Sequence, residues 1–261
     1  MMPQTMSCLA GIIILLFMVA CHPARKQVDG ILDTAELIMN DHPDSALSLL
    51  RGLDSVATSS RADKARAALL HQMALDKCYI DITSDSILSP AIQWFTRHGT
   101  ADQKLQTWYY RSVLARNAKD FDQQMAYLIE AERYIEKAND PLMAGRLYTA
   151  KYVNFLNIYS LSDSAIAAEK AVAAFLQAGD RTRYHNAIIN LANIYDILGR
   201  DAEVQPLLDT LRSHWDVLTI RQQRQTDAIT LASLENDPVR RLSLLEEYLE
   251  RVPDKEINWT V

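Results

Sequence analysis

The sequence predicts an all-α protein, built as a stack of antiparallel helix pairs, and three observations support this prediction. The chain of 261 residues holds only seven Gly and eight Pro, which lie mostly between the apolar-periodic stretches and not within them. Apolar residues recur at helical spacing in segment after segment, as at Leu69 and Met73 or at Val153 and Leu156. A short pattern also returns at intervals of about forty residues, which is typical of helical repeat arrays.

Residues 1–20 are predicted to be a lipoprotein signal peptide, and residues 21–27 a lipidated tether. An uncharged apolar run from Leu9 to Ala20 is shorter than the roughly 20 residues that span a bilayer. The run ends in Met18-Val19-Ala20-Cys21, which resembles the bacterial lipobox and implies that Cys21 becomes the lipidated N-terminus. Several acyl chains on Cys21, such as palmitate, would hold the protein stably to a membrane. No Lys or Arg precedes the run, and the alternatives are an ordinary signal peptide with an incidental cysteine or an uncleaved anchor.

An Asp-Ser pair that returns at three places marks the repeat. Asp44-Ser45, Asp85-Ser86 and Asp163-Ser164 follow one another at separations of 41 and 78 residues, about one and two repeat lengths. Because Asp or Ser at an N-cap accepts hydrogen bonds from the free amides of a first turn, each pair is expected to open the second helix of a unit. The chain is thus expected to form a repeat domain over residues 28–261 with about six helix pairs, at 28–55, 60–98, 101–138, 141–178, 181–214 and 217–251. The expected inner turns lie near Asp41-His42, Ser84-Asp85, Lys119-Asp120, Leu161-Ser162, Gly199-Arg200 and Asn236-Asp237.

The pair at 181–214 carries a family resemblance. Leu191-Ala192-Asn193-Ile194-Tyr195, followed by Gly199, resembles the tetratricopeptide signature, which implies a right-handed superhelical stack for the whole repeat domain. The period of about 40 exceeds the family's 34. The stretch from Leu32 to Leu47 resembles the start of tetratricopeptide lipoproteins of the Bacteroidetes type. This second resemblance implies a lipid anchor in a Gram-negative membrane, with the protein facing the periplasm.

The sequence predicts no catalytic residue, no metal site and no cofactor. Each Gly is isolated, so no phosphate-cradling loop is expected. His71 and Cys78 could share a helix face, but no cluster of His or Cys completes a zinc site. The other histidines stand singly near turns or on polar faces. The net charge of −6 argues against a nucleic-acid partner, because no basic face is available to neutralise phosphates.

A stripe of asparagines is the candidate binding surface. Asn is a poor helix former, so several of them at face spacing call for a reason. First helices line the concave surface of tetratricopeptide stacks, and the resemblance implies that Asn side chains there hold a peptide backbone. Arg183 and Arg146 could add a grip on a carboxylate. The alternative is that these residues only cap or solubilise helix faces. The candidate asparagines are Asn154 and Asn157 on one first helix and Asn186, Asn190 and Asn193 on the next.

The expected function is that of a membrane-tethered scaffold that binds a protein or peptide, and not that of an enzyme. A second hypothesis comes from the last helix, where Leu242, Leu245 and Leu249 form an apolar stripe with no polar capping helix after it. A partner would cover that stripe, or the chain is the sensor portion of a longer signalling protein. A third and weaker hypothesis is a glycan-binding or cell-wall-acting lipoprotein.

Overall fold

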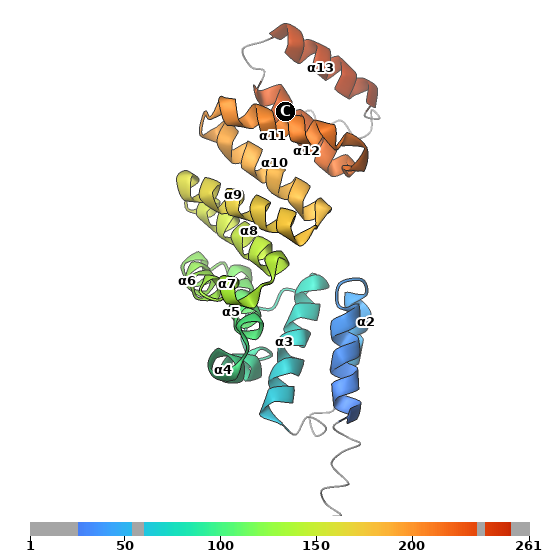
Figure 1. Ribbon diagram of the computed structural model, residues 1–261, viewed down its shortest axis with the longest axis vertical. Helices are drawn as coiled ribbons and strands as arrows, with labels where there is room; N and C mark the ends of the chain where they lie inside the picture. The colour runs from blue at the N-terminus through green and yellow to red at the C-terminus, as the bar shows by residue number, and fades with distance from the viewer. Residues whose placement is uncertain (1–25, 54–59, 234–237, 252–261) are drawn as a thin grey trace, which may run out of the picture. The chain divides into compact units, whose positions relative to one another are not determined.

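The computed structural model describes residues 26–53, 60–233 and 238–251, and within these ranges the chain is helical and contains no strand (Figure 1). The predicted signal peptide, Cys21 and the turn expected near Asn236-Asp237 lie outside the described residues. None of the described helices combines the length and the apolar character that crossing a membrane requires.

The helices group into two compact units that divide between residues 138 and 139. In both units, helices that follow one another along the chain pack against each other as adjacent pairs. The prediction of an all-α stack of helix pairs is therefore confirmed. The first unit holds a helix over residues 26–38, α2 (Pro43–Arg51), α3 (Arg61–Lys77), α4 (Ser89–His98), α5 (Ala101–Asn117), α6 (Phe121–Glu132) and α7 (Ile135–Ala138). The second holds α8 (Pro141–Asn157), α9 (Leu161–Ala178), α10 (Arg181–Ile197), α11 (Asp201–Ser213), the 3₁₀ turn η1 (Trp215–Val217), α12 (Ile220–Ser233) and α13 (Pro238–Arg251).

The first helix of a pair recurs with a period of 40 residues. Helices α3, α5, α8 and α10 are each 17 residues long, and each begins 40 residues after the one before. A capping side chain precedes each of them and accepts a hydrogen bond from the amide three residues on, which satisfies a free donor of the first turn. These four N-caps, Ser60, Thr100, Asp140 and Asp180, repeat with the same period.

The turn that ends each of these helices repeats as well. Tyr79, Lys119, Tyr159 and Gly199 follow one another at 40-residue intervals and all have a positive φ, between 57° and 65°. In each turn the next amide bonds back to the carbonyl five residues earlier, as Arg200 does to Tyr195 at 2.9 Å. This is the Schellman arrangement, in which glycine is the least strained residue at the positive-φ position. Only the last of the four turns has glycine there.

The Asp-Ser pairs do not open the second helices in the way the sequence suggested. Asp44 and Asp163 lie inside the first turns of α2 and α9, where a carboxylate meets the positive end of the helix dipole. Asp85 lies in a non-helical connection over residues 78–88, and α4 begins only at Ser89. The reason is local. The Ser84 hydroxyl accepts a hydrogen bond from the Ser86 amide and closes a small turn. Pro90 then lies in the first turn of α4.

Each unit has its own apolar core. In the first unit, Leu32 and Met39 are buried together with Leu47 of α2 and Leu75 of α3. In the second unit, Ile188 and Ile194 of α10 are buried with Leu208 of α11. Figure 1 shows the pairs α8/α9 and α10/α11 stacked in succession in this unit.

Candidate functional site

The asparagines of α10 lie on the side of this helix that its neighbours leave open. Eight of the 17 residues of α10 are buried, whereas Asn186 is exposed, Asn190 and Asn193 are half-buried and Ile197 is 60% exposed. These four positions are spaced by four, three and four residues, so they share one face of the helix. We call them the α10 stripe.

One amide of the α10 stripe already has a partner within the fold. The side-chain nitrogen of Gln222, at the start of α12, donates 2.8 Å to Asn186 Oδ1 and 3.0 Å to the Thr182 carbonyl. The carbonyl of the same Gln222 side chain accepts the Thr219 amide, so one buried residue both caps α12 and ties it to α10. The side chains of Asn190 and Asn193 form no hydrogen bond with another described residue. Their amides therefore keep both a donor and an acceptor for a partner.

Asn154 differs from the expectation, because it is buried with 1% exposure and its side chain is engaged within the fold. The 40-residue period explains this burial. It places Asn154 at the position of Ile194, which is fully buried in α10, and it places Asn157 at the position of Ile197. Asn157 is exposed at the end of α8. The three-residue spacing of the two asparagines indicated a common face, but packing separates them.

The two arginines are also engaged within the fold. The Arg183 guanidinium pairs with Asp180, the N-cap of its own helix, and its side chain is 45% exposed. Burial alone would raise the pKa of Asp180, but the amide and guanidinium of Arg183 hold it below its ordinary value. Arg146 is half-buried, and its Nη1 lies 4.0 Å from the Met143 sulfur. A carboxylate grip at Arg183 would therefore compete with the cap of α10.

A pair of histidines, of which His185 is buried and His214 exposed, is a feature that the sequence did not predict. His185 is 3% exposed, and its Nε2 lies 3.2 Å from Nδ1 of His214, across the contact between α10 and the end of α11. Burial lowers the pKa of His185, and the nearby His214 and Arg181 lower it further. The two rings border a cavity of about 360 Å³ that Arg181, Tyr184 and Asp216 also line. The facing nitrogens can form one hydrogen bond, and the lowered pKa of His185 disfavours its protonated form.

These histidines stand 29 residues apart, so no local spacing signalled them. Their position beside Ser213 and Asp216 does not form a nucleophile with its base, because the Ser213 hydroxyl donates to the Thr210 carbonyl. In the ranges 26–53, 60–233 and 238–251, no three residues among His, Cys, Asp and Glu gather as a metal site. Comparison with protein-family models, curated proteins and solved structures finds no match to this chain.

Proposed function

We propose that the protein is a lipid-anchored scaffold on a Gram-negative membrane that faces the periplasm and binds a protein or peptide segment through the α10 stripe. Cys21 carries the anchor in this proposal, and α8 adds Asn157. The proposal involves no cofactor and no chemical step.

The observation that carries this proposal is the state of Asn190 and Asn193. Both amides are half-buried on a helix whose other faces are packed, and neither forms a hydrogen bond with another described residue. A peptide backbone offers one donor and one acceptor per residue, which is what each of these amides can match. Ile197 follows on the same stripe with 60% exposure, and it offers an apolar contact beside the amides.

The test is partner capture from detergent-solubilised membranes with the full-length chain as bait. Replacing Asn190 and Asn193 together by Ala is expected to lose a partner that the unchanged chain retains. Gln27→Ala with Asn40→Ala removes two exposed amides of the first unit and is the matched control. Thermal unfolding of both variants checks that the fold is intact. Capture that survives the Asn190 and Asn193 changes would remove the α10 stripe from the proposal.

The anchor is tested separately, by metabolic labelling with a fatty acid that carries a chemical handle. Label is expected on the unchanged chain and not on Cys21→Ala. A label that persists in this variant would show that the lipid sits elsewhere.

A second candidate function has support from α13. Val239, Leu242 and Leu245 are exposed there by 80%, 57% and 39%, whereas Leu244 is buried. Exposed apolar residues on a helix of a repeat array call for a cover, which a sensor portion of a longer signalling protein would find in a further segment. Sequencing past codon 261 tests this candidate. A continuing frame with an apolar run of about 20 residues favours the sensor, and an immediate stop codon excludes it.

A further inference from the structure

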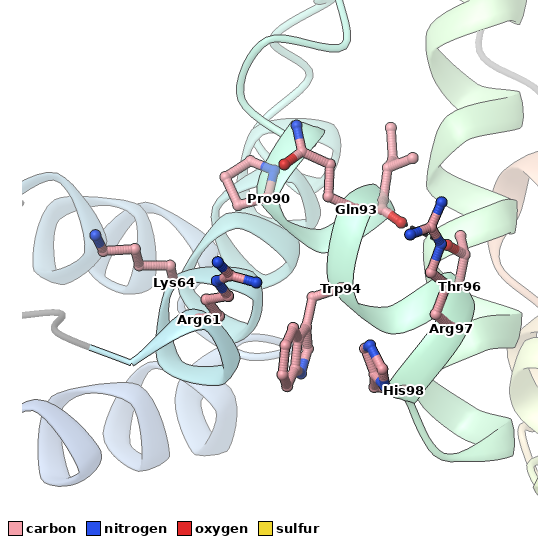
Figure 2. A pocket seen from close by; sticks show the side chains of 9 residues that line it. Arg61, Lys64, Pro90, Gln93, Trp94, Thr96, Arg97 and His98 are labelled. Carbon is pink, nitrogen blue, oxygen red and sulfur yellow. Dashed lines mark hydrogen bonds between the residues drawn. The ribbon is translucent and has the colours of Figure 1, made fainter.

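An open pocket of about 750 Å³ lies between the first turn of α3 and the helix α4, within the first unit (Figure 2). Its volume falls in the range of sites that bind small molecules or single chemical groups. Nine residues line it, and none of them is acidic: Arg61, Lys64, Pro90, Ile92, Gln93, Trp94, Thr96, Arg97 and His98.

The pocket combines unpaired cations with an indole. Arg61, Lys64 and Arg97 are exposed, and none of them forms an ion pair with another described residue. Trp94 is half-buried, and its ring lies 4.5 Å from that of His98 at an angle of 40°. Figure 2 shows the indole between Arg61, which comes from α3, and the imidazole of His98 at the end of α4. The first turn of α3 adds the positive end of a helix dipole on the same side.

The position of the pocket in the first unit follows from the helix register. Helix α3 runs in the same direction as the helix over residues 26–38 (Figure 1). Arg66 of α3 pairs with Asp33 at 2.8 Å and fixes their register. Arg61 lies five residues before Arg66, and Lys26 lies seven residues before Asp33, so the two are about 7 and 10 Å from this ion pair in the same direction. Figure 1 shows both helices beginning at the same end of the unit.

The helix over residues 26–38 begins at this end of the unit, and Cys21 precedes its first residue by only a few positions in the sequence. Lys26 is five positions after Cys21 in the sequence, and a fully extended chain of this length spans at most about 18 Å. A lipid on Cys21 therefore holds the start of the helix at 26–38, and with it the mouth of the pocket, close to the membrane surface. This step rests on the proposed anchor at Cys21.

The geometry points to a membrane-contact site, in which the pocket takes the phosphate group of an anionic lipid headgroup. Arg and Lys bind phosphate oxygens through charge-assisted hydrogen bonds, and an anionic leaflet attracts such residues. Tryptophan prefers the depth of the headgroups, where its ring meets apolar material and its N–H meets water. Together these contacts orient the first unit on the membrane that anchors the chain.

Vesicle sedimentation of the polypeptide His22–Val261 tests the site without the lipid, and this polypeptide retains every described residue. We expect binding to phosphatidylcholine vesicles that contain about 30 mol% phosphatidylglycerol, and little binding to phosphatidylcholine alone. Arg61→Gln with Lys64→Gln is expected to lower the partition coefficient by about tenfold or more. Lys119→Gln with Lys137→Gln removes the same charge from exposed positions of the same unit, outside the pocket, and is expected to have less than about a twofold effect.

Two further measurements decide the source of the phosphate and the role of the indole. Trp94→Phe keeps every charge and is expected to weaken vesicle binding, and brominated phosphatidylglycerol is expected to quench the unchanged protein more than this variant. The site would be overturned if the Lys119/Lys137 control lost as much vesicle binding as the Arg61/Lys64 variant, or if the unchanged polypeptide bound neutral vesicles equally well.

A separate experiment measures the binding of inorganic phosphate in solution at constant ionic strength. Arg61-dependent binding of phosphate without any vesicle binding would assign the pocket to a soluble anion and overturn the membrane contact. Because no lipid on Cys21 takes part, these outcomes are independent of the labelling test of the anchor.

Discussion

The hydroxyl of Tyr195 donates a 2.6 Å hydrogen bond to Glu169 Oε1 and so joins α10 to α9 of the preceding helix pair. The guanidinium of Arg200, at the turn that follows α10, lies 3.9 Å from the centre of the Tyr195 ring. A carboxylate therefore binds the Tyr195 hydroxyl, and a cation that lies 3.9 Å from the same carboxylate covers the Tyr195 ring. Burial, and then the bond to Glu169, raise the pKa of Tyr195 to about 12.

The first prediction concerns alkaline pH. A tyrosine whose pKa is raised in the folded state favours folding while it is protonated, so its contribution is complete below the unfolded pKa of about 10 and is lost as the pH rises toward 12. Tyr195→Phe is expected to lower the free energy of unfolding by about 1 kcal/mol at neutral pH. Between about pH 8 and about pH 11, the free energy of unfolding measured with urea is expected to decrease less for the variant than for the unchanged chain. Equal decreases would show that the Glu169 bond does not control this titration.

The second prediction concerns acidic pH and the His185–His214 pair. Because burial and neighbouring charges lower the pKa of His185, the unfolded chain takes up this proton at a higher pH than the folded chain. Its contribution to stability is complete above the unfolded pKa of about 6.5 and is lost as the pH falls through the lower, folded value. The unfolding midpoint of the unchanged chain is expected to fall more steeply below about pH 6.5 than that of His185→Gln, which cannot titrate. His98→Gln, which removes one imidazole at an exposed position, is the matched control.

The third prediction uses two glycines inside helices. A Cβ on Gly145 would lie 2.5 Å from the ring of Phe175, which is buried between α8 and α9, whereas nothing lies within 4 Å of a Cβ on Gly30. Gly30→Ala is expected to raise the free energy of unfolding by about 0.5–1 kcal/mol, since Ala is the better helix former. Gly145→Ala gains the same helix propensity, but because of overpacking it is expected to lower the free energy of unfolding by a net ~1–2 kcal/mol. Chemical unfolding measures both. A smaller loss for Gly145→Ala in a Phe175→Leu background would identify the ring as the cause.

The fourth prediction uses the repeated turns with positive φ. Tyr159 has a φ of 59° and is 87% exposed, so its side chain contributes little packing in return for the strained backbone. Tyr159→Gly is expected to raise the free energy of unfolding by about 0.5–1 kcal/mol. Gly199→Ala, at the equivalent turn 40 residues later, is expected to lower it by about 1 kcal/mol. Thermal and urea unfolding compare the two. A loss of stability in Tyr159→Gly would mean that the exposed ring has a structural contact that outweighs the strain.

Several parts of the fold could be predicted from the sequence because their causes lie within a few residues. The caps Asp140 and Asp180 accept hydrogen bonds from amides three residues on. Gly199 adopts a positive φ in its turn because glycine has no Cβ. The spacing of Asn186, Asn190 and Asn193 defines a helix face whatever surrounds it. Local rules failed at Asp85-Ser86, where a serine turn and Pro90 move the start of α4 to Ser89.

By itself the sequence determined the fold class, the helix pairs and the period of about forty residues, because hydrogen bonds between near neighbours and apolar periodicity set them. The tertiary structure alone decided which side of each helix is covered, and so buried Asn154 while it exposed Asn157. It also brought His185 to His214 and Arg61 to Trp94. These residues are far apart in the chain, and their meeting depends on how one helix packs against another, which no short stretch of sequence specifies.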